Sequence, residues 1–304
     1  MRVQFLVASS TSTDTLPLKF KHRMKMDRRW QTFPVCLFVS MLITLSPPSH
    51  AQTRAQCEQQ FKARSGQPGK DVMWVATIDQ LVTAMLRAAK VTNTDRVIDL
   101  GSGDGKIPIA AAKQFGAQAL GIEYEPGLVK LAECYARAER VTHKVKFRQA
   151  DIFTTDFSDA TVLTLYLSPT INLKLRPTIL NMRPGTRVVS NSFDMGDWQP
   201  DRSIESEIGN TRAFLWIVPA NVNGQWTFTN AARRSTFKVK LEQKFQKLIG
   251  TPGSATHWGV QQGRVNGSEI ELTVVASDGT ALALKGRVAN DRIDAQGYAG
   301  RRNL

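Results

Sequence analysis

The sequence has few cysteines and lacks a long hydrophobic run. Only 3 of its 304 residues are cysteine. Cys57 and Cys134 remain if the N-terminal segment is removed, and Cys134 lies in an expected helix. We expect these two cysteines not to form a disulfide. The apolar stretch at residues 33–45 is shorter than the roughly 20 residues needed to span a bilayer. A membrane anchor is therefore the weaker interpretation of this stretch.

The sequence also lacks a block of basic residues after its first 51 positions. Without residues 1–51, which hold seven of the 40 basic and two of the 26 acidic residues, the formal net charge is 33 minus 24, or +9. A scattered charge of this kind is usual for a solvated surface. The charge therefore gives no specific signal for nucleic acid. No metal-ligating motif and no obligatory general base can be identified either.

Residues 1–51 resemble a secretory signal. A basic run at residues 19–29 precedes the apolar stretch, and Ser49 and Ala51 are small residues at the positions before a cleavage site. This order predicts cleavage after Ala51 and an exported or periplasmic protein, with membrane proximity through the apolar stretch. Translation that starts at Met24 or Met26 would give a signal of ordinary length. The alternatives to export are a retained inner-membrane anchor and a cytoplasmic protein.

The most informative stretch is residues 97–106. Four residues typical of a strand run into a turn, and the apolar positions after the turn suit a helix. The turn contains the glycines Gly101, Gly103 and Gly105. Bare backbone and a helix N-terminus suit a ligand that accepts hydrogen bonds from amides. Two carboxylates, Asp99 and Asp104, favour a ligand that is cationic at one end.

The glycine spacing and the acids that follow narrow the ligand class. The spacing G-x-G-x-G disfavours an NAD-binding oxidoreductase, whose loop reads G-x-G-x-x-G. Glu123 ends a second expected strand about 20 residues after the loop, where nucleotide folds place an acid that accepts hydrogen bonds from ribose. A third expected strand, at residues 145–152, ends in Asp151. Three acids thus lie at three successive strand ends.

These features resemble motif I and the following strands of the class I S-adenosylmethionine-dependent methyltransferases. The resemblance implies a Rossmann-like doubly wound α/β sheet and S-adenosyl-L-methionine as cofactor. It places Asp151 near the adenine amino group. The residues that it implies in cofactor binding are Asp99, Gly101, Ser102, Gly103, Asp104, Gly105, Glu123 and Asp151.

A further part of the resemblance precedes the glycine loop. Related methyltransferases fold a segment such as Tyr-Val-Pro-Thr-Pro over the cofactor, and this chain has Trp-Val-Ala-Thr-Ile at residues 74–78. Both prolines are replaced, so we expect a less rigid segment. Trp74 and Thr77 are candidates to line the methionine end of the cofactor site.

A fourth expected strand runs into the loop at residues 166–170, which should border the transferred methyl group. The chain lacks the Asn/Asp-Pro-Pro-Tyr sequence of many amino methyltransferases here. Residues 71–218 instead resemble the lysine methyltransferases that act on the ATP synthase c-subunit, and their bacterial relatives. The resemblance implies a protein substrate bearing a lysine, with Tyr166, Ser168 and Pro169 as candidate walls of the acceptor channel.

The pattern changes after Pro219, where turn signals separate alternating apolar and polar residues. We therefore expect a linker at residues 52–70, the methyltransferase domain at 71–219 and a small antiparallel β accessory domain at 220–304. An exported enzyme would meet little S-adenosylmethionine, which is made in the cytoplasm. The alternative function is thus an exported noncatalytic protein that binds a nucleoside-like ligand.

Overall fold

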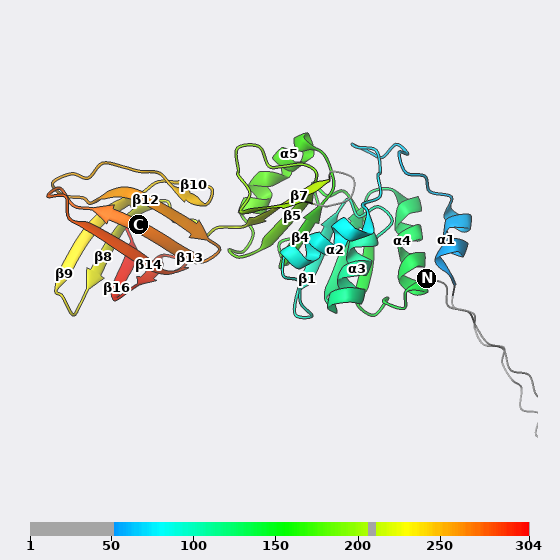
Figure 1. Cartoon of the computed structure of the whole chain (residues 1–304), viewed down its shortest axis with the longest axis horizontal. Coiled ribbons are helices and arrows are strands. Elements are labelled where there is room, and N and C mark those ends of the chain that lie inside the picture. Colours follow the sequence, from blue (N-terminus) through cyan, green and yellow to red (C-terminus); the bar gives the residue numbers. More distant parts are fainter. Residues whose placement is uncertain (1–51, 206–210, 304) are drawn as a thin grey trace, which may run out of the picture. The chain divides into compact units, whose positions relative to one another are not determined.

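The computed structural model describes residues 52–205 and 211–303. The signal-like segment at residues 1–51 lies outside the described residues. Two sheets organise the rest of the chain (Figure 1). No helix among the described residues is long and apolar enough to cross a membrane.

The first sheet confirms the predicted doubly wound fold. Its order is β3-β2-β1-β4-β5-β7-β6, with β1 to β5 parallel and β7 antiparallel to both its neighbours. Its strands are β1 (Arg96–Leu100), β2 (Gln118–Glu123), β3 (Val145–Gln149), β4 (Val162–Leu165), β5 (Arg187–Asn191), β6 (Arg202–Glu205) and β7 (Arg212–Ile217). The strand order reverses between β1 and β4, which is where such sheets bind ligands.

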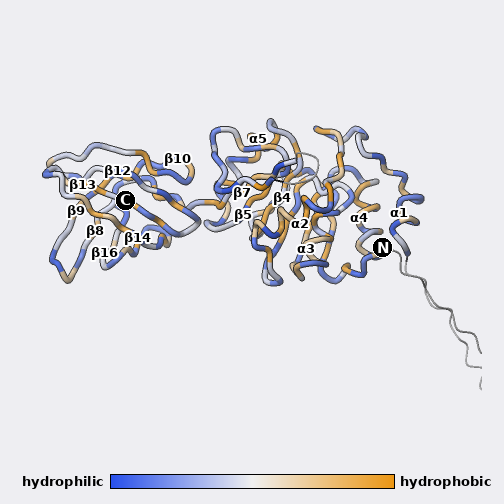
Figure 2. The backbone as a smooth tube through the Cα atoms, in the orientation of Figure 1, coloured by the Kyte–Doolittle hydropathy of each residue, from blue (hydrophilic) through white to orange (hydrophobic). Residues whose placement is uncertain are grey.

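Helices cover both faces of this sheet. They are α1 (Arg54–Phe61), α2 (Asp79–Ala88), α3 (Lys106–Phe115), α4 (Pro126–Ala138) and α5 (Pro169–Leu180). One core contains buried residues of α2, α3 and α4, whereas a second core contains those of α5. Val97 contributes to the first core and Ile98 to the second, because successive side chains of a strand point to opposite faces. Figure 2 shows the resulting hydrophobic stretches in the strands and helices.

A disulfide joins Cys57 in α1 to Cys134 in α4. The expectation of two free cysteines was therefore wrong. Both side chains are fully buried, and the pairing depends on α1 packing along α4, which the sequence separation of 77 residues does not reveal. Helix α1 itself lies in the segment that we predicted as a linker.

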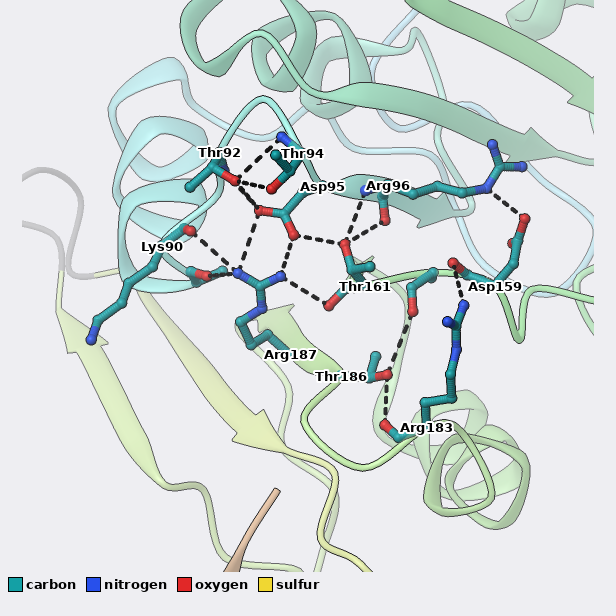
Figure 3. A network of polar contacts seen from close by, with 12 residues as sticks. Lys90, Thr92, Thr94, Asp95, Arg96, Asp159, Thr161, Arg183, Thr186 and Arg187 are labelled. Atoms are coloured by element: carbon teal, nitrogen blue, oxygen red, sulfur yellow. Dashed lines mark hydrogen bonds and ion pairs between the residues drawn. The ribbon is translucent and has the colours of Figure 1, made fainter. Parts of the chain in front are cut away.

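An ion pair stabilises the end of the first sheet at which strands β1, β4 and β5 begin (Figure 3). Asp95 is paired with Arg187 and accepts a hydrogen bond from Thr161 Oγ1 at 2.8 Å. Arg187 also donates to the carbonyl of Ala89 at the end of α2, at 3.0 Å. Burial would raise the pKa of Asp95, but the hydrogen bonds from Arg187, Thr161 and the Thr92 amide outweigh it and hold that pKa below its usual value. The network therefore ties three strands and a helix together.

The second sheet is antiparallel and has the order β10-β11-β12-β13-β14-β15-β16-β8-β9. Its strands are β8 (Gly224–Asn230), β9 (Ser235–Leu241), β10 (Gln243–Lys244), β11 (Lys247–Leu248), β12 (Gly259–Asn266), β13 (Glu269–Val275), β14 (Ala281–Ala289), β15 (Arg292–Ala295) and β16 (Tyr298–Arg302). It has a hydrophobic core of its own, in which Trp226 and Phe228 are fully buried. A parallel bridge between Val239 in β9 and Trp258 shows that the sheet curls back toward β12.

Candidate active site

The glycine loop connects β1 to α3 at the carboxyl edge of the first sheet. Gly101, Gly103 and Gly105 all have positive φ angles, of 73°, 53° and 78°. At Gly103 a Cβ atom would lie 2.2 Å from the indole nitrogen of Trp74, so this position also needs glycine for space. The amides of Gly101 and Ser102 donate to the carbonyl of Ile122 at 2.9 and 3.1 Å. The loop is thus tied to the end of β2.

A cavity of about 870 Å³, its open mouth included, lies against this loop. The predicted site residues that line it are Trp74, Thr77, Asp99, Gly101, Ser102, Asp104, Glu123, Asp151 and Tyr166. Gly103 and Gly105 belong to the loop but do not line the cavity.

Glu123 holds the glycine loop in place from the end of β2. Its Oε2 accepts a hydrogen bond from the Gly103 amide at 2.8 Å, and its Oε1 accepts one from the Glu125 amide at 2.9 Å. Each carboxylate oxygen has a second lone pair. Glu123 can therefore accept hydrogen bonds from a ligand's hydroxyl groups while it continues to hold the loop.

Asp99 is the most deeply buried acid of the cavity, at 2% exposed. Burial raises its pKa to about 7, aided by the nearby charges of Glu123 and Asp104 and opposed by a hydrogen bond from Thr164 Oγ1 at 2.6 Å. Burial also raises the pKa of Asp104. The charges of Lys106 and Arg54 partly oppose this effect at Asp104, whereas no cationic side chain of the described residues lowers the pKa of Asp99. A cationic ligand would therefore stabilise the charged form of Asp99.

The residues present fit S-adenosylmethionine. Ser102 Oγ is buried in the cavity wall and has no hydrogen-bond partner among the described residues, so a polar ligand would satisfy it. Glu123 and Asp151 offer acceptors for ribose hydroxyls and an adenine amino group. Asp99 and Asp104 offer negative charge for a sulfonium and an ammonium. These groups all face one cavity.

Residues 66–77, here named the cover segment, form one wall of the cavity. The segment folds on itself: Gly66 N donates to Trp74 O at 2.7 Å and Trp74 N donates to Gln67 O at 3.0 Å. Asp151 accepts a hydrogen bond from Lys70 Nζ at 2.5 Å, and this bond lowers the pKa of Asp151. The predicted adenine acceptor is thus paired with a lysine of the cover segment.

Two further contacts hold the other end of the cover segment. Lys106 Nζ donates to the Thr77 carbonyl at 2.9 Å and forms an ion pair with Asp79 at 3.0 Å. Asn191 Nδ2 donates to Thr77 Oγ1 at 3.2 Å. Sequence reasoning missed Lys70, Lys106 and Asn191. Of these three residues, only Lys106 had a local signal in the sequence, which was its position directly after the glycine loop.

Of the three residues predicted to form the acceptor channel, one lines the cavity and two do not. Tyr166 lines the cavity and stacks on Phe193, with ring centroids 6.3 Å apart. Ser168 and Pro169 do not line it. Ser168 is the N-cap of α5, where its Oγ accepts a hydrogen bond from the Ile171 amide at 3.3 Å, and Pro169 is the first helical residue. Leu167 and Ile171 line the cavity instead.

The sheet order, the glycine loop and the acid-lined cavity define a class I S-adenosylmethionine-dependent methyltransferase. Residues 99–202 match the sequence profile of the ANTKMT methyltransferase domain. A protein-lysine N-methyltransferase of Saccharolobus islandicus is 36% identical over 151 residues, which are 48% of this chain and 94% of that protein. The chain belongs to the S-adenosylmethionine-dependent methyltransferase family that includes this Saccharolobus protein.

Two other proteins are similar to about half of the chain. The ATP synthase c-subunit lysine N-methyltransferase of Xenopus laevis is 35% identical over 160 residues, covering 52% of this chain and 62% of that protein. An RNA methyltransferase of Salinibacter ruber, solved with S-adenosyl-L-homocysteine, is 47% identical, covers 49% of this chain and 96% of that one, and gives a TM-score of 0.47. The ANTKMT match ends before the second sheet begins.

Proposed function

We propose that this enzyme transfers a methyl group from S-adenosylmethionine to the side-chain amine of a lysine in a protein. The observation that carries the proposal is the match to nearly the whole of the Saccharolobus protein-lysine methyltransferase. The Xenopus relative, which is named for a lysine of the ATP synthase c-subunit, supports the same acceptor. Nothing in these comparisons favours a noncatalytic binding protein.

Methyl transfer needs little from the protein beyond the positioning of the donor and the acceptor. When bound, the cofactor supplies a methyl group on a sulfonium, which is already a good leaving group. Tyr166, Leu167 and Ile171 line the cavity, and in this proposal they border the acceptor and keep water from it. A lysine amine that enters such an apolar wall has a lowered pKa, which favours its neutral, nucleophilic form. Alignment of donor and acceptor then provides most of the rate.

We further propose that the protein acts after export, which requires S-adenosylmethionine to reach it outside the cytoplasm. The signal-like order of residues 1–51 is one support. The other is the buried Cys57–Cys134 disulfide, because disulfides persist in oxidising compartments and are rare in the cytoplasm. Fractionation with N-terminal sequencing tests this: the mature protein should begin at Gln52 outside the inner membrane. A form that retains residues 33–45 in the membrane fraction would favour the anchored alternative.

Methyl transfer to lysine is tested with the oxidised full chain, tritiated S-adenosylmethionine and the purified c-subunit of ATP synthase. A lysine-rich soluble protein and an RNA of mixed sequence are the competing acceptors. We expect label in a protein acceptor, at lysine by mass spectrometry, and none after that acceptor's lysines have been acetylated. Labelling of RNA alone would refute the lysine proposal while leaving the methyltransferase class intact.

A further inference from the structure

Helix α1 depends on its contacts with α4. It has only eight residues, and Cys57 is its single buried residue. Isolated helices shorter than about 12 residues are marginal in water. Besides the disulfide, α1 contacts α4 through Glu58, which accepts a hydrogen bond from the Tyr135 hydroxyl at 3.0 Å, and through Arg54, which pairs with Glu139 at 3.4 Å. The covalent bond is therefore the strongest attachment of α1.

Helix α1 leads directly into the cover segment. The helix ends at Lys62, which adopts a left-handed conformation, and the cover segment begins at Gly66. At its other end the cover segment runs into α2 at Asp79. The disulfide thus fixes the chain nine residues before the cover segment, so that both of its ends are anchored.

We propose that the Cys57–Cys134 disulfide positions the cover segment over the cofactor cavity, so that cofactor affinity depends on the oxidation state of these two cysteines. Reduction by a dithiol breaks the sulfur–sulfur bond, adds one electron and one proton to each sulfur, and converts the dithiol to its own disulfide. The inference rests on the cofactor cavity and not on the identity of the methyl acceptor.

The middle of the cover segment is held by a weak ion pair and by two partly buried side chains, Val72 and Trp74, that pack against the cores of the first sheet. The Lys70 and Asp151 side chains are 33% and 28% exposed, and ion pairs exposed to water contribute little. Trp74 contacts the glycine loop only while the segment is closed. An apparent dissociation constant rises in proportion as the closed fraction falls. A segment that is closed a fifth of the time would weaken cofactor binding about fivefold.

Calorimetric titration with S-adenosyl-L-homocysteine tests this on the full chain. The oxidised parent is compared with the Cys57→Ser/Cys134→Ser variant, whose folding is checked by circular dichroism. We expect the dissociation constant of the variant to be at least about fivefold higher, and trypsin to cleave after Lys62 and Lys70 faster. Asp95→Asn is the matched control, because it weakens the contacts at the end of the first sheet that lies away from the cofactor cavity. Its melting temperature should fall, while its affinity for the ligand stays within about twofold of the parent's.

A second variant separates positioning from general loss of structure. Trp74→Ala removes the contact of the cover segment with the glycine loop, so it should weaken binding in the oxidised parent but add little to the double-serine variant. Equal affinity of the folded double-serine variant and the parent would overturn the inference, as would no binding by the parent. Binding by the parent without methylation of lysine would refute the proposed function alone.

Discussion

Asp99 should make cofactor binding depend on pH. Its carboxyl is buried beside two other acids, and its pKa is raised to about 7. A ligand with a sulfonium and an ammonium binds the ionised form. That form makes up about 3% of the free protein at pH 5.5 and about half at pH 7, so affinity for S-adenosylmethionine should rise about fifteenfold over this interval. Asp104, whose pKa is also raised by burial, acts in the same direction.

The stability of the ligand-free protein should change in the opposite sense. Because the folded protein holds the Asp99 proton more tightly than the unfolded chain does, the free energy of unfolding falls as pH rises from about 4 to about 7. Asn at this position cannot ionise and can still accept the hydrogen bond from Thr164. Asp99→Asn should therefore melt at a higher temperature than the parent at pH 8, with no such advantage at pH 4.

The assay is calorimetry from pH 5.5 to 7, which stays below the pKa of an α-amino group and so keeps the ligand's charge constant. The Asp99→Asn variant should bind more weakly than the parent at pH 7 and show a much smaller dependence on pH. A parent affinity that does not change over this range, or an equal slope in the variant, would refute the assignment of the cationic end of the ligand to Asp99.

Three further changes test other parts of the structure. Asp95→Ala leaves Arg187 without its carboxylate partner. The free energy of unfolding at pH 7, measured by urea titration, should therefore fall by about 1.5–3 kcal/mol. The difference in stability between variant and parent should be smaller below the pKa that Asp95 has in the folded protein. Gly103→Ala should weaken S-adenosylmethionine binding at least about tenfold, a loss of about 1.4 kcal/mol, because the added methyl group meets the Trp74 indole ring and φ is positive at this residue. The control is Gly127→Ala, at a helical position with open space around it. This variant should bind normally and gain up to about 1 kcal/mol of stability. Glu123→Gln should weaken binding about tenfold without loss of fold; unchanged affinity would exclude it as a ribose ligand.

Local patterns were sufficient to predict the first strand, its glycine loop and the helix that follows, and the resemblance to class I methyltransferases gave the sheet as a whole. A strand, a glycine turn and a helix follow one another within residues 96–115, so their order in the sequence gives their order in space. Glu123 and Asp151 could be placed because parallel strands end at a common edge. Nine of the predicted site residues consequently line one cavity.

Other features depended on contacts that no local pattern records. The pairing of Cys57 with Cys134 follows from the packing of α1 on α4, and the Lys70 contact to Asp151 joins residues 81 positions apart. Ser168 and Pro169 have a local explanation instead. A serine followed by proline is a common start of a helix, and the two residues begin α5. Their place in the acceptor channel stays a prediction.

The cover segment shows how a missing local constraint is replaced by distant ones. Two prolines of the related methyltransferase pattern are absent from residues 74–78, so we expected a looser segment. Proline stabilises a loop mainly by restricting the unfolded chain. Here backbone hydrogen bonds between Trp74 and Gly66 or Gln67 restrict the folded segment, and a disulfide restricts the unfolded chain over a much longer loop. A proline at position 76 can therefore replace part of the restriction that the disulfide provides. Ala76 is a suitable position because its amide donates no hydrogen bond in the described structure. Ala76→Pro, added to the double-serine variant, should recover part of the cofactor affinity that this variant loses.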